Sequence, residues 1–283
     1  MKKFIIALLI ICLIAVVVLA ADIVYLHKSD MQHELAAEPA ATTEPTARPT
    51  EEPTAQPTEE PTARPTEDLQ QPEINKTIYL TFDDGPYKYT EKLLNILNEK
   101  GVKATFFVTA QNGDYVNLIK AEHDAGHSIG IHTASHVYKN IYSSEENFFS
   151  DFYAMQQMVF DQTGKYAKLY RFPGGSSNTI SGDYSKGIIS KLAEDLQNRG
   201  YTYVDWNVNS GDSEGLKTAE EVFENTVKEI ENLGSADAVV LLHDIHEWAV
   251  DAVPMIIDWG KENKCTFAAL SEDTPQIHFE IAN

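Results

Sequence analysis

The sequence predicts an α/β domain whose parallel sheet closes into a barrel. Strand-like and helix-like stretches alternate seven times between residues 74 and 283, a pattern typical of a parallel sheet covered by helices. Reactive side chains lie at or just past the ends of five different predicted strands: Asp83, Asp84, His132, Arg171, Asp212 and His243. A barrel gathers such strand ends on one face, whereas an open sheet focuses them at one switch point.

The strands are predicted from short runs rich in β-branched and aromatic residues. These runs cover residues 78–82, 105–108, 127–132, 168–172, 201–208, 238–242 and 266–270. Helices are predicted between them from apolar residues at three- and four-residue spacing, with Thr90 and Thr218 as N-caps and Gly101 as a C-cap. The helices cover residues 90–100, 114–125, 144–162, 185–199, 218–233 and 248–262.

Residues 1–29 indicate a membrane segment. Phe4 to Ala21 contains eighteen residues without a charge and follows Lys2 and Lys3. A secretory signal core has about 7–15 residues and a membrane-spanning helix about 20, so the run favours a retained single-pass anchor. Val18-Leu19-Ala20 resembles a cleavage site, which leaves a cleaved signal as the alternative. The two lysines favour a cytoplasmic N-terminus, so the following residues are expected outside the cell.

Residues 30–73 indicate a linker with an internal repeat. The octad Glu44-Pro45-Thr46-Ala47-Arg48-Pro49-Thr50-Glu51 recurs at residues 52–59, with Gln56 in place of Arg48, and again at 60–67. Proline at every fourth position prevents a helix, and little apolar surface is present to offset the entropy of ordering. The composition therefore predicts a disordered, extended spacer before the domain at 74–283.

Charge and cysteine content exclude two classes of protein. The formal net charge is −21, from 22 Lys and Arg against 43 Asp and Glu. A nucleic-acid partner is not expected, because phosphate binding needs a basic surface. The two cysteines are Cys12, within the apolar N-terminal run, and Cys265. A disulfide framework is therefore not expected either.

Carboxylates and histidines after neighbouring strands predict a metal site. His132 and His136 are four residues apart and would face the same way if the chain turned helically there. Asp83 and Asp84 are adjacent carboxylates, which are costly to hold in a partly buried site without a cation. One carboxylate with two imidazoles suits zinc with an open position for water.

Four short motifs resemble those of one enzyme family. They are Thr81-Phe82-Asp83-Asp84-Gly85-Pro86, His132-Thr133-Ala134-Ser135-His136, Arg171-Phe172-Pro173-Gly174-Gly175 and Leu241-Leu242-His243-Asp244. They are similar to four of the five motifs of the NodB-homology polysaccharide deacetylases, carbohydrate esterase family four. The resemblance implies a distorted (β/α)7 barrel and one Zn²⁺, or another divalent ion such as Co²⁺, Ni²⁺ or Mn²⁺. It also implies hydrolysis of N-acetyl or O-acetyl groups on a polysaccharide.

The resemblance implies a role for each matching residue in the first three motifs. Asp84, His132 and His136 would be the metal ligands. Asp83 would be the general base, and Arg171 would pair with it, although a surface ion pair would also explain an arginine at this position.

The remaining matches complete the expected chemistry. The Gly174 N–H would help to stabilise the oxyanion, and His243 would be the general acid. Leu241 would line the pocket for the acetyl methyl group, although core packing explains it equally well. The chemistry is consistent without the family, because amide hydrolysis needs an activated water, charge stabilisation at the oxygen and a proton for the amine.

The fifth motif departs from the family pattern Asp-x-x-Asp-Trp. One alignment uses Asp205-Trp206, and the other uses Asp212 with Ser213 in place of tryptophan. Asp212 is favoured because it lies past the strand end, and the resemblance implies that it tunes His243.

Because the motif tryptophan is missing, one wall of the expected substrate groove has no assigned residue. Trp206, Trp248 and Tyr87 are the candidates for an aromatic platform, although such residues are more often core or surface rings.

The expected protein is a membrane-anchored, extracellular, metal-dependent N-deacetylase of cell-wall polysaccharide, with peptidoglycan N-acetylglucosamine as the first-choice substrate. Chitooligosaccharides, another exported polysaccharide and O-acetyl xylan are the alternatives within the enzyme class. A catalytically inactive glycan-binding barrel and a barrel metallohydrolase of another kind, such as a cyclic-amide hydrolase, are the alternatives outside it.

Overall fold

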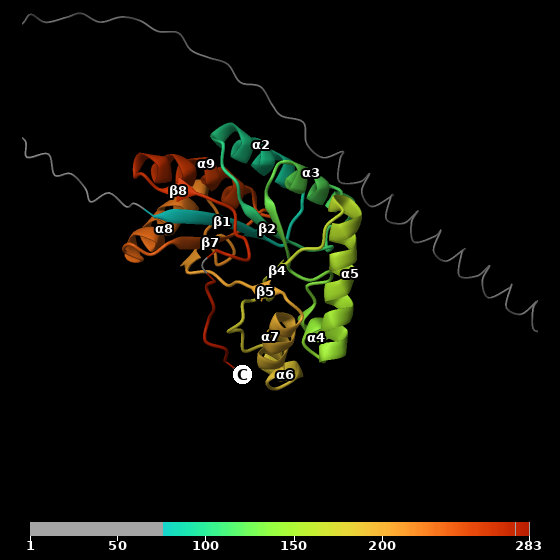
Figure 1. Cartoon of the computed structure of the whole chain (residues 1–283). Coiled ribbons are helices and arrows are strands. Elements are labelled where there is room, and N and C mark those ends of the chain that lie inside the picture. Colours follow the sequence, from blue (N-terminus) through green and yellow to red (C-terminus); the bar gives the residue numbers. More distant parts are fainter. Residues whose placement is uncertain (1–75, 275, 283) are drawn as a thin grey trace, which may run out of the picture. The chain divides into compact units, whose positions relative to one another are not determined.

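The computed structural model describes residues 76–274 and 276–282 of the chain (Figure 1). The expected membrane segment at 1–29 and linker at 30–73 lie outside the described residues. Among the described residues, we find no helix with the length and apolar character needed to cross a membrane.

Eight parallel strands form one sheet in the described part of the chain. They are β1 Thr77–Asp83, β2 Thr105–Val108, β3 Ser128–Ile131, β4 Leu169–Tyr170, β5 Thr202–Tyr203, β6 Val208–Asn209, β7 Ala238–His243 and β8 Thr266–Phe267. The order is β5-β4-β3-β2-β1-β7-β6, and β8 also pairs with β1. The predicted parallel α/β architecture is confirmed, and the sheet curls as a half-barrel with helices around it (Figure 1).

Helices cover the outside of the sheet (Figure 1). They are α2 Thr90–Lys100, α3 Leu118–Asp124, α4 Tyr138–Ile141, α5 Glu145–Thr163, α6 Ser181–Tyr184, α7 Ile188–Asn198, α8 Ala219–Asn232 and α9 Glu247–Glu262, with a 3₁₀ turn at Gly113–Tyr115. Side-chain caps begin two of them: Ser144 accepts from the Asn147 N–H, and Thr218 accepts from the Glu221 N–H. Thr90 is not the predicted N-cap: it is the first residue of α2, and its hydroxyl accepts from the Tyr87 N–H and donates to Asp244.

Alternation along the strands separates two sets of side chains. In β1, Ile78, Leu80 and Phe82 are buried in the larger core, whereas Tyr79 belongs to a smaller cluster with Phe107, Leu169, Val204, Val239 and Leu270. Successive strand residues point to opposite faces, so Thr81 and Asp83 share the side of Tyr79. The β1–β7 register pairs Asp83 with His243, which brings two predicted site residues to the same end of the sheet.

The predicted single strand at 201–208 is wrong, because the structure divides it into β5 and β6. The carbonyls of Val204 and Asp205 accept from the Arg171 guanidinium at 2.9 Å each and so do not continue a ladder. No ladder joins β5 to β6 among the residues the structure covers. A segment near the C-terminus lies there instead: the Asp205 N–H donates to the Ile277 carbonyl at 2.8 Å.

Candidate active site

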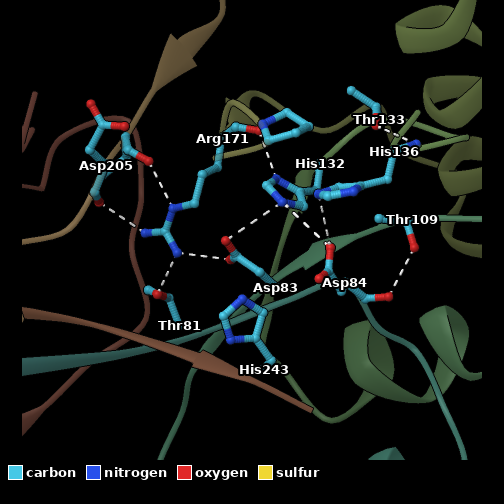
Figure 2. A network of polar contacts seen from close by, with 12 residues as sticks. Thr81, Asp83, Asp84, Thr109, His132, Thr133, His136, Arg171, Asp205 and His243 are labelled. Carbon is cyan, nitrogen blue, oxygen red and sulfur yellow. Dashed lines mark hydrogen bonds and ion pairs between the residues drawn. The ribbon is translucent and has the colours of Figure 1, made fainter. Parts of the chain in front are cut away.

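Three predicted metal ligands converge past the ends of two strands (Figure 2). Asp84 follows β1, while His132 and His136 lie in the loop after β3. The Nε2 atoms of His132 and His136 are 3.6 and 3.3 Å from Asp84 Oδ1. Each residue has a ligand atom within 4.8 Å of the other two, so the three groups could hold a metal ion.

The chemistry of these groups fits a divalent cation. Asp84 Oδ1 is buried and has no hydrogen-bond partner. His132 Nδ1 is 2.8 Å from the Arg171 carbonyl, which can only accept, so the ring hydrogen is on Nδ1 and the Nε2 lone pair is left for a ligand. Burial lowers the pKa of His132 to about 3, which keeps the ring neutral. Two atoms each about 2.0 Å from a tetrahedral zinc lie about 3.3 Å apart, close to the distances found here.

The loop that carries the two histidines does not form the helical turn that would make residues four apart face the same way. Thr133 and His136 adopt φ values of 90° and 52°, a region costly for residues other than glycine. The Thr133 hydroxyl accepts from the His136 N–H at 3.1 Å (Figure 2). The backbone turn therefore brings the imidazoles together without a helix.

Asp151, on α5, is a residue that sequence reasoning missed. Its Oδ1 accepts from the Ala134 N–H at 2.6 Å and from the Ser135 N–H at 3.1 Å. These two amides lie between His132 and His136, so the carboxylate holds the loop in its unusual conformation. Nothing in the sequence near Asp151 marks it, because its partners are 16 and 17 residues away.

Asp83 is buried and is paired with a buried arginine (Figure 2). Arg171 Nη1 donates to Asp83 Oδ1 at 2.8 Å and to Thr81 Oγ1 at 2.7 Å. Arg171 is 0% exposed, so it is not part of a surface ion pair. Burial raises the pKa of Asp83 and the Arg171 charge opposes the rise. Asp83 Oδ2 lies 3.8 Å from His132 Nε2, which places the second oxygen beside the candidate metal site formed by Asp84, His132 and His136.

His243 lies across the site and is held by Asp212. Its Nδ1 donates to Asp212 Oδ1 at 2.9 Å, and its N–H donates to Asp212 Oδ2 at 2.7 Å. Burial lowers the pKa of His243, but the hydrogen bond and charge of Asp212 outweigh it and raise that pKa to about 9. Asp205 does not contact His243; its carboxylate accepts from the Ser176 N–H at 2.8 Å instead.

These groups surround one cavity of about 270 Å³. It is lined by Asp83, Asp84, His132, His136, Tyr138, Gly174, Trp206, Asn209, Ser213, Glu214, Leu241 and His243. Gly174 has φ 77°, and a Cβ there would collide with the Tyr138 hydroxyl, so the position requires glycine.

Of the three aromatic candidates for the groove wall, Trp206 is the one that lines the cavity. Trp248 donates from Nε1 to the Asp212 carbonyl at 2.9 Å and stacks on His246. Tyr87 packs edge-on against Tyr89 and Tyr115. Trp206 is therefore the candidate for an aromatic wall of this cavity, which Ser213 cannot supply.

Comparison with known proteins identifies the family. The family model described as polysaccharide deacetylase matches residues 70–191. A peptidoglycan-N-acetylglucosamine deacetylase from Bacillus cereus is 33% identical over 216 residues, which cover 73% of this chain and 72% of the relative. The chain belongs to the polysaccharide deacetylase family.

Solved structures agree with this assignment. The catalytic domain of a peptidoglycan N-acetylglucosamine deacetylase from Eubacterium rectale matches with a TM-score of 0.72 and 48% identity, over 74% of this chain and 94% of that one. A polysaccharide deacetylase from Bacillus cereus matches with a TM-score of 0.63 and 32% identity, over 72% and 97% of the two chains. This polysaccharide deacetylase is accordingly a hydrolase.

Proposed function

We propose that this polysaccharide deacetylase removes the N-acetyl group from N-acetylglucosamine in peptidoglycan. The observation that carries the proposal is the arrangement of two buried pairs, Asp83 with Arg171 and His243 with Asp212, around one ligand cluster in a single cavity. The relatives named as peptidoglycan deacetylases support the choice of substrate.

Asp84, His132 and His136 would hold the metal, which we propose to be Zn²⁺, with Co²⁺, Ni²⁺ or Mn²⁺ as substitutes. When bound, such an ion supplies a Lewis acid for the acetyl carbonyl and lowers the pKa of water to about 7. The neutral His132 ring and the unpaired Asp84 oxygen suit this role.

Asp83 takes the proton of the attacking water at Oδ2. Its other oxygen is fixed by Arg171, so the carboxylate cannot turn away. Gly174 lines the same cavity, and its N–H would donate to the oxygen that becomes negative. Leu241 lines the wall for the acetyl methyl group.

His243 gives a proton to the departing amine from Nε2, since its Nδ1 hydrogen is held by Asp212. With its pKa near 9 the ring is protonated at neutral pH, as a general acid must be. A glycan-binding barrel without turnover would have no use for an acid and a base on either side of a ligand cluster.

Release of acetate tests the function. Wall digests, chitooligosaccharides and acetylated xylan would each be incubated with the enzyme, and loss of acetyl would be read by mass spectrometry. We expect N-acetylglucosamine residues of peptidoglycan to react fastest. Preferential release from chitooligosaccharides or from xylan would replace the proposed substrate with that one, and release from none would favour the binding protein.

We further propose that residues 1–29 are a retained anchor and that residues 30–73 let the barrel, of the distorted (β/α)7 class, work within the wall. The 34 residues from Pro39 to Pro72 would reach on the order of 100 Å at about 3.1 Å each. Fractionation of cells tests this: the enzyme should remain with the membrane, and recovery of a shortened form from the medium would show signal cleavage instead.

A further inference from the structure

We infer that residues 276–282, near the C-terminus, are a working part of the substrate site: through Asp205 and Trp206 they position the aromatic wall of the cavity and the loop that carries Gly174. The inference rests on the proposed function only for the identity of the sugar. The segment itself lies outside the recognised motifs, which end at Asp244.

The segment lies like an added strand at the open edge of β5. Its burial alternates: Ile277, Phe279 and Ile281 are half-buried, whereas the residues between them are exposed, the two-residue period of a strand. The Ile277 carbonyl accepts from the Asp205 N–H. His278 stacks on Tyr203 at 4.0 Å between ring centroids and its Nε2 lies 2.8 Å from the Tyr203 carbonyl. These contacts hold the segment beside β5.

Asp205 joins this segment to the loop after β4. It is 0% exposed, and its carboxylate accepts from the Ser176 N–H at 2.8 Å, from the Ser176 hydroxyl and from the Phe279 N–H at 2.9 Å. Hydrogen bonds to a buried carboxylate are stronger than neutral ones. Ser176 follows Gly174 by two residues, so one buried carboxylate links the Gly174 loop to the C-terminal segment.

Trp206 is the second connection. It lines the cavity, and the Phe279 ring packs edge-on against it, with centroids 4.9 Å apart and planes at 84°. Gly175 lies close to both rings, because a Cβ at this position would be 3.0 Å from Trp206 and 3.1 Å from Phe279. The indole therefore packs against both Gly175 and Phe279, and a side chain larger than hydrogen at Gly175 would press on both rings.

The consequence for binding follows from the chemistry of sugars. The apolar C–H face of a pyranose packs against a rigid aromatic ring, and the indole is the largest such ring. Ser213, where the family motif has tryptophan, cannot supply that surface. Trp206 takes over the wall, and Phe279 fixes its orientation as a positioning residue that does not touch the reacting atoms.

The test compares two substrates in four variants. Phe279→Ala removes the support of Trp206, and an aromatic pair is worth about 0.5–1.5 kcal/mol, so KM for an N-acetylglucosamine oligomer should rise roughly 2- to 10-fold. Turnover of a small aryl acetate, which has no sugar ring, should stay unchanged. Asp205→Asn loosens the Gly174 loop, so kcat should fall on both substrates with zinc content unchanged. Phe160→Ala, which removes a part-exposed ring on α5, is the control and should alter neither.

Two results would overturn the inference. Equal losses on both substrates in Phe279→Ala would show general damage, and an unchanged KM for the oligomer would show that Trp206 needs no support. Phe279→Leu keeps apolar bulk without the ring and is less prone to misfold than Phe279→Ala. It should show the same result, a raised KM for the oligomer with unchanged turnover of the aryl acetate. If the wild type acts on xylan and not on the oligomer, the proposed function fails, and the same KM comparison on xylan decides the inference.

Discussion

Asp212 binds both the ring and the backbone of His243, at 2.9 Å from Nδ1 and 2.7 Å from the amide nitrogen. One carboxylate thus fixes where the imidazole lies, which tautomer it adopts and how firmly it holds its second proton. Through these two contacts, Asp212 of the fifth motif positions His243, although Ser213 replaces the tryptophan of that motif.

Removing the Asp212 charge should change the pH profile of the enzyme. The pKa of His243 is raised to about 9, so the acid form is present below that pH and is lost as the pH rises through it. In Asp212→Asn, burial still lowers the pKa while the raising charge is gone, so the alkaline limb of kcat should move to lower pH. Profiles of kcat against pH for this variant and for Asp251→Asn, a surface carboxylate paired with Lys92, would measure the shift. An unmoved limb in Asp212→Asn would contradict the acid role of His243.

Asp83→Asn and Asp84→Ala should fail in different ways although the residues are neighbours. Asp84 is one of the three residues that could hold a metal ion, so Asp84→Ala should lose metal together with activity. Asp83 is paired with Arg171 and is not one of the proposed ligands. The Asp83→Asn variant should therefore retain metal while kcat falls roughly 10²–10⁴-fold, the scale of general-base catalysis. Zinc stoichiometry beside kcat separates them, with His243→Ala expected to retain zinc. Metal loss in Asp83→Asn and retention in Asp84→Ala would exchange the two roles.

Asp151→Ala should weaken zinc binding although Asp151 is no ligand. Without its carboxylate, the amides of Ala134 and Ser135 lose their acceptor and the left-handed turn loses its support. Loss of such outer contacts typically costs about 10–100-fold in metal affinity. Chelator competition would measure it, with Asp161→Ala on the same helix as the control, since Asp161 bonds Gln157 instead. Equal affinities in the two variants would make Asp151 merely a structural residue.

The fragment 74–283 should fold and deacetylate soluble oligosaccharide without the preceding residues. The described strands begin at Thr77, and the cavity residues all follow it. Circular dichroism, a melting curve and acetate release would be compared with the full chain. An unfolded fragment in the presence of zinc would show that the domain begins earlier.

Deleting two of the three octads should lower activity on intact cell wall and leave turnover of soluble oligomers unchanged. The reason is reach, because a shorter tether gives the barrel access to less of the wall. A scrambled spacer of the same length and composition is the matched control and should behave as the wild type. Equal losses on both substrates would place the octads in the site itself.

Local patterns were enough to predict the parallel α/β architecture. The buried strands of a parallel sheet form continuous apolar runs, and capping residues such as Thr218 mark where helices begin. Both signals are contained in short stretches of sequence. The motifs at Asp83-Asp84, His132 and His243 were visible for the same reason, because each lies at or just past the end of a strand.

Contacts between residues far apart in the sequence decided the features that local patterns could not predict. The guanidinium of Arg171 donates to the carbonyls of Val204 and Asp205, and so divides the strand predicted at 201–208. Asp212 reaches His243 across 31 residues, and Phe279 reaches Asp205 across 74. The sequence by itself determined which elements form and which chemical groups stand at their ends, because propensity and periodicity act locally. Only the tertiary structure decided which aspartate supports the acid and what holds the groove wall, because hydrogen bonds form between neighbours in space.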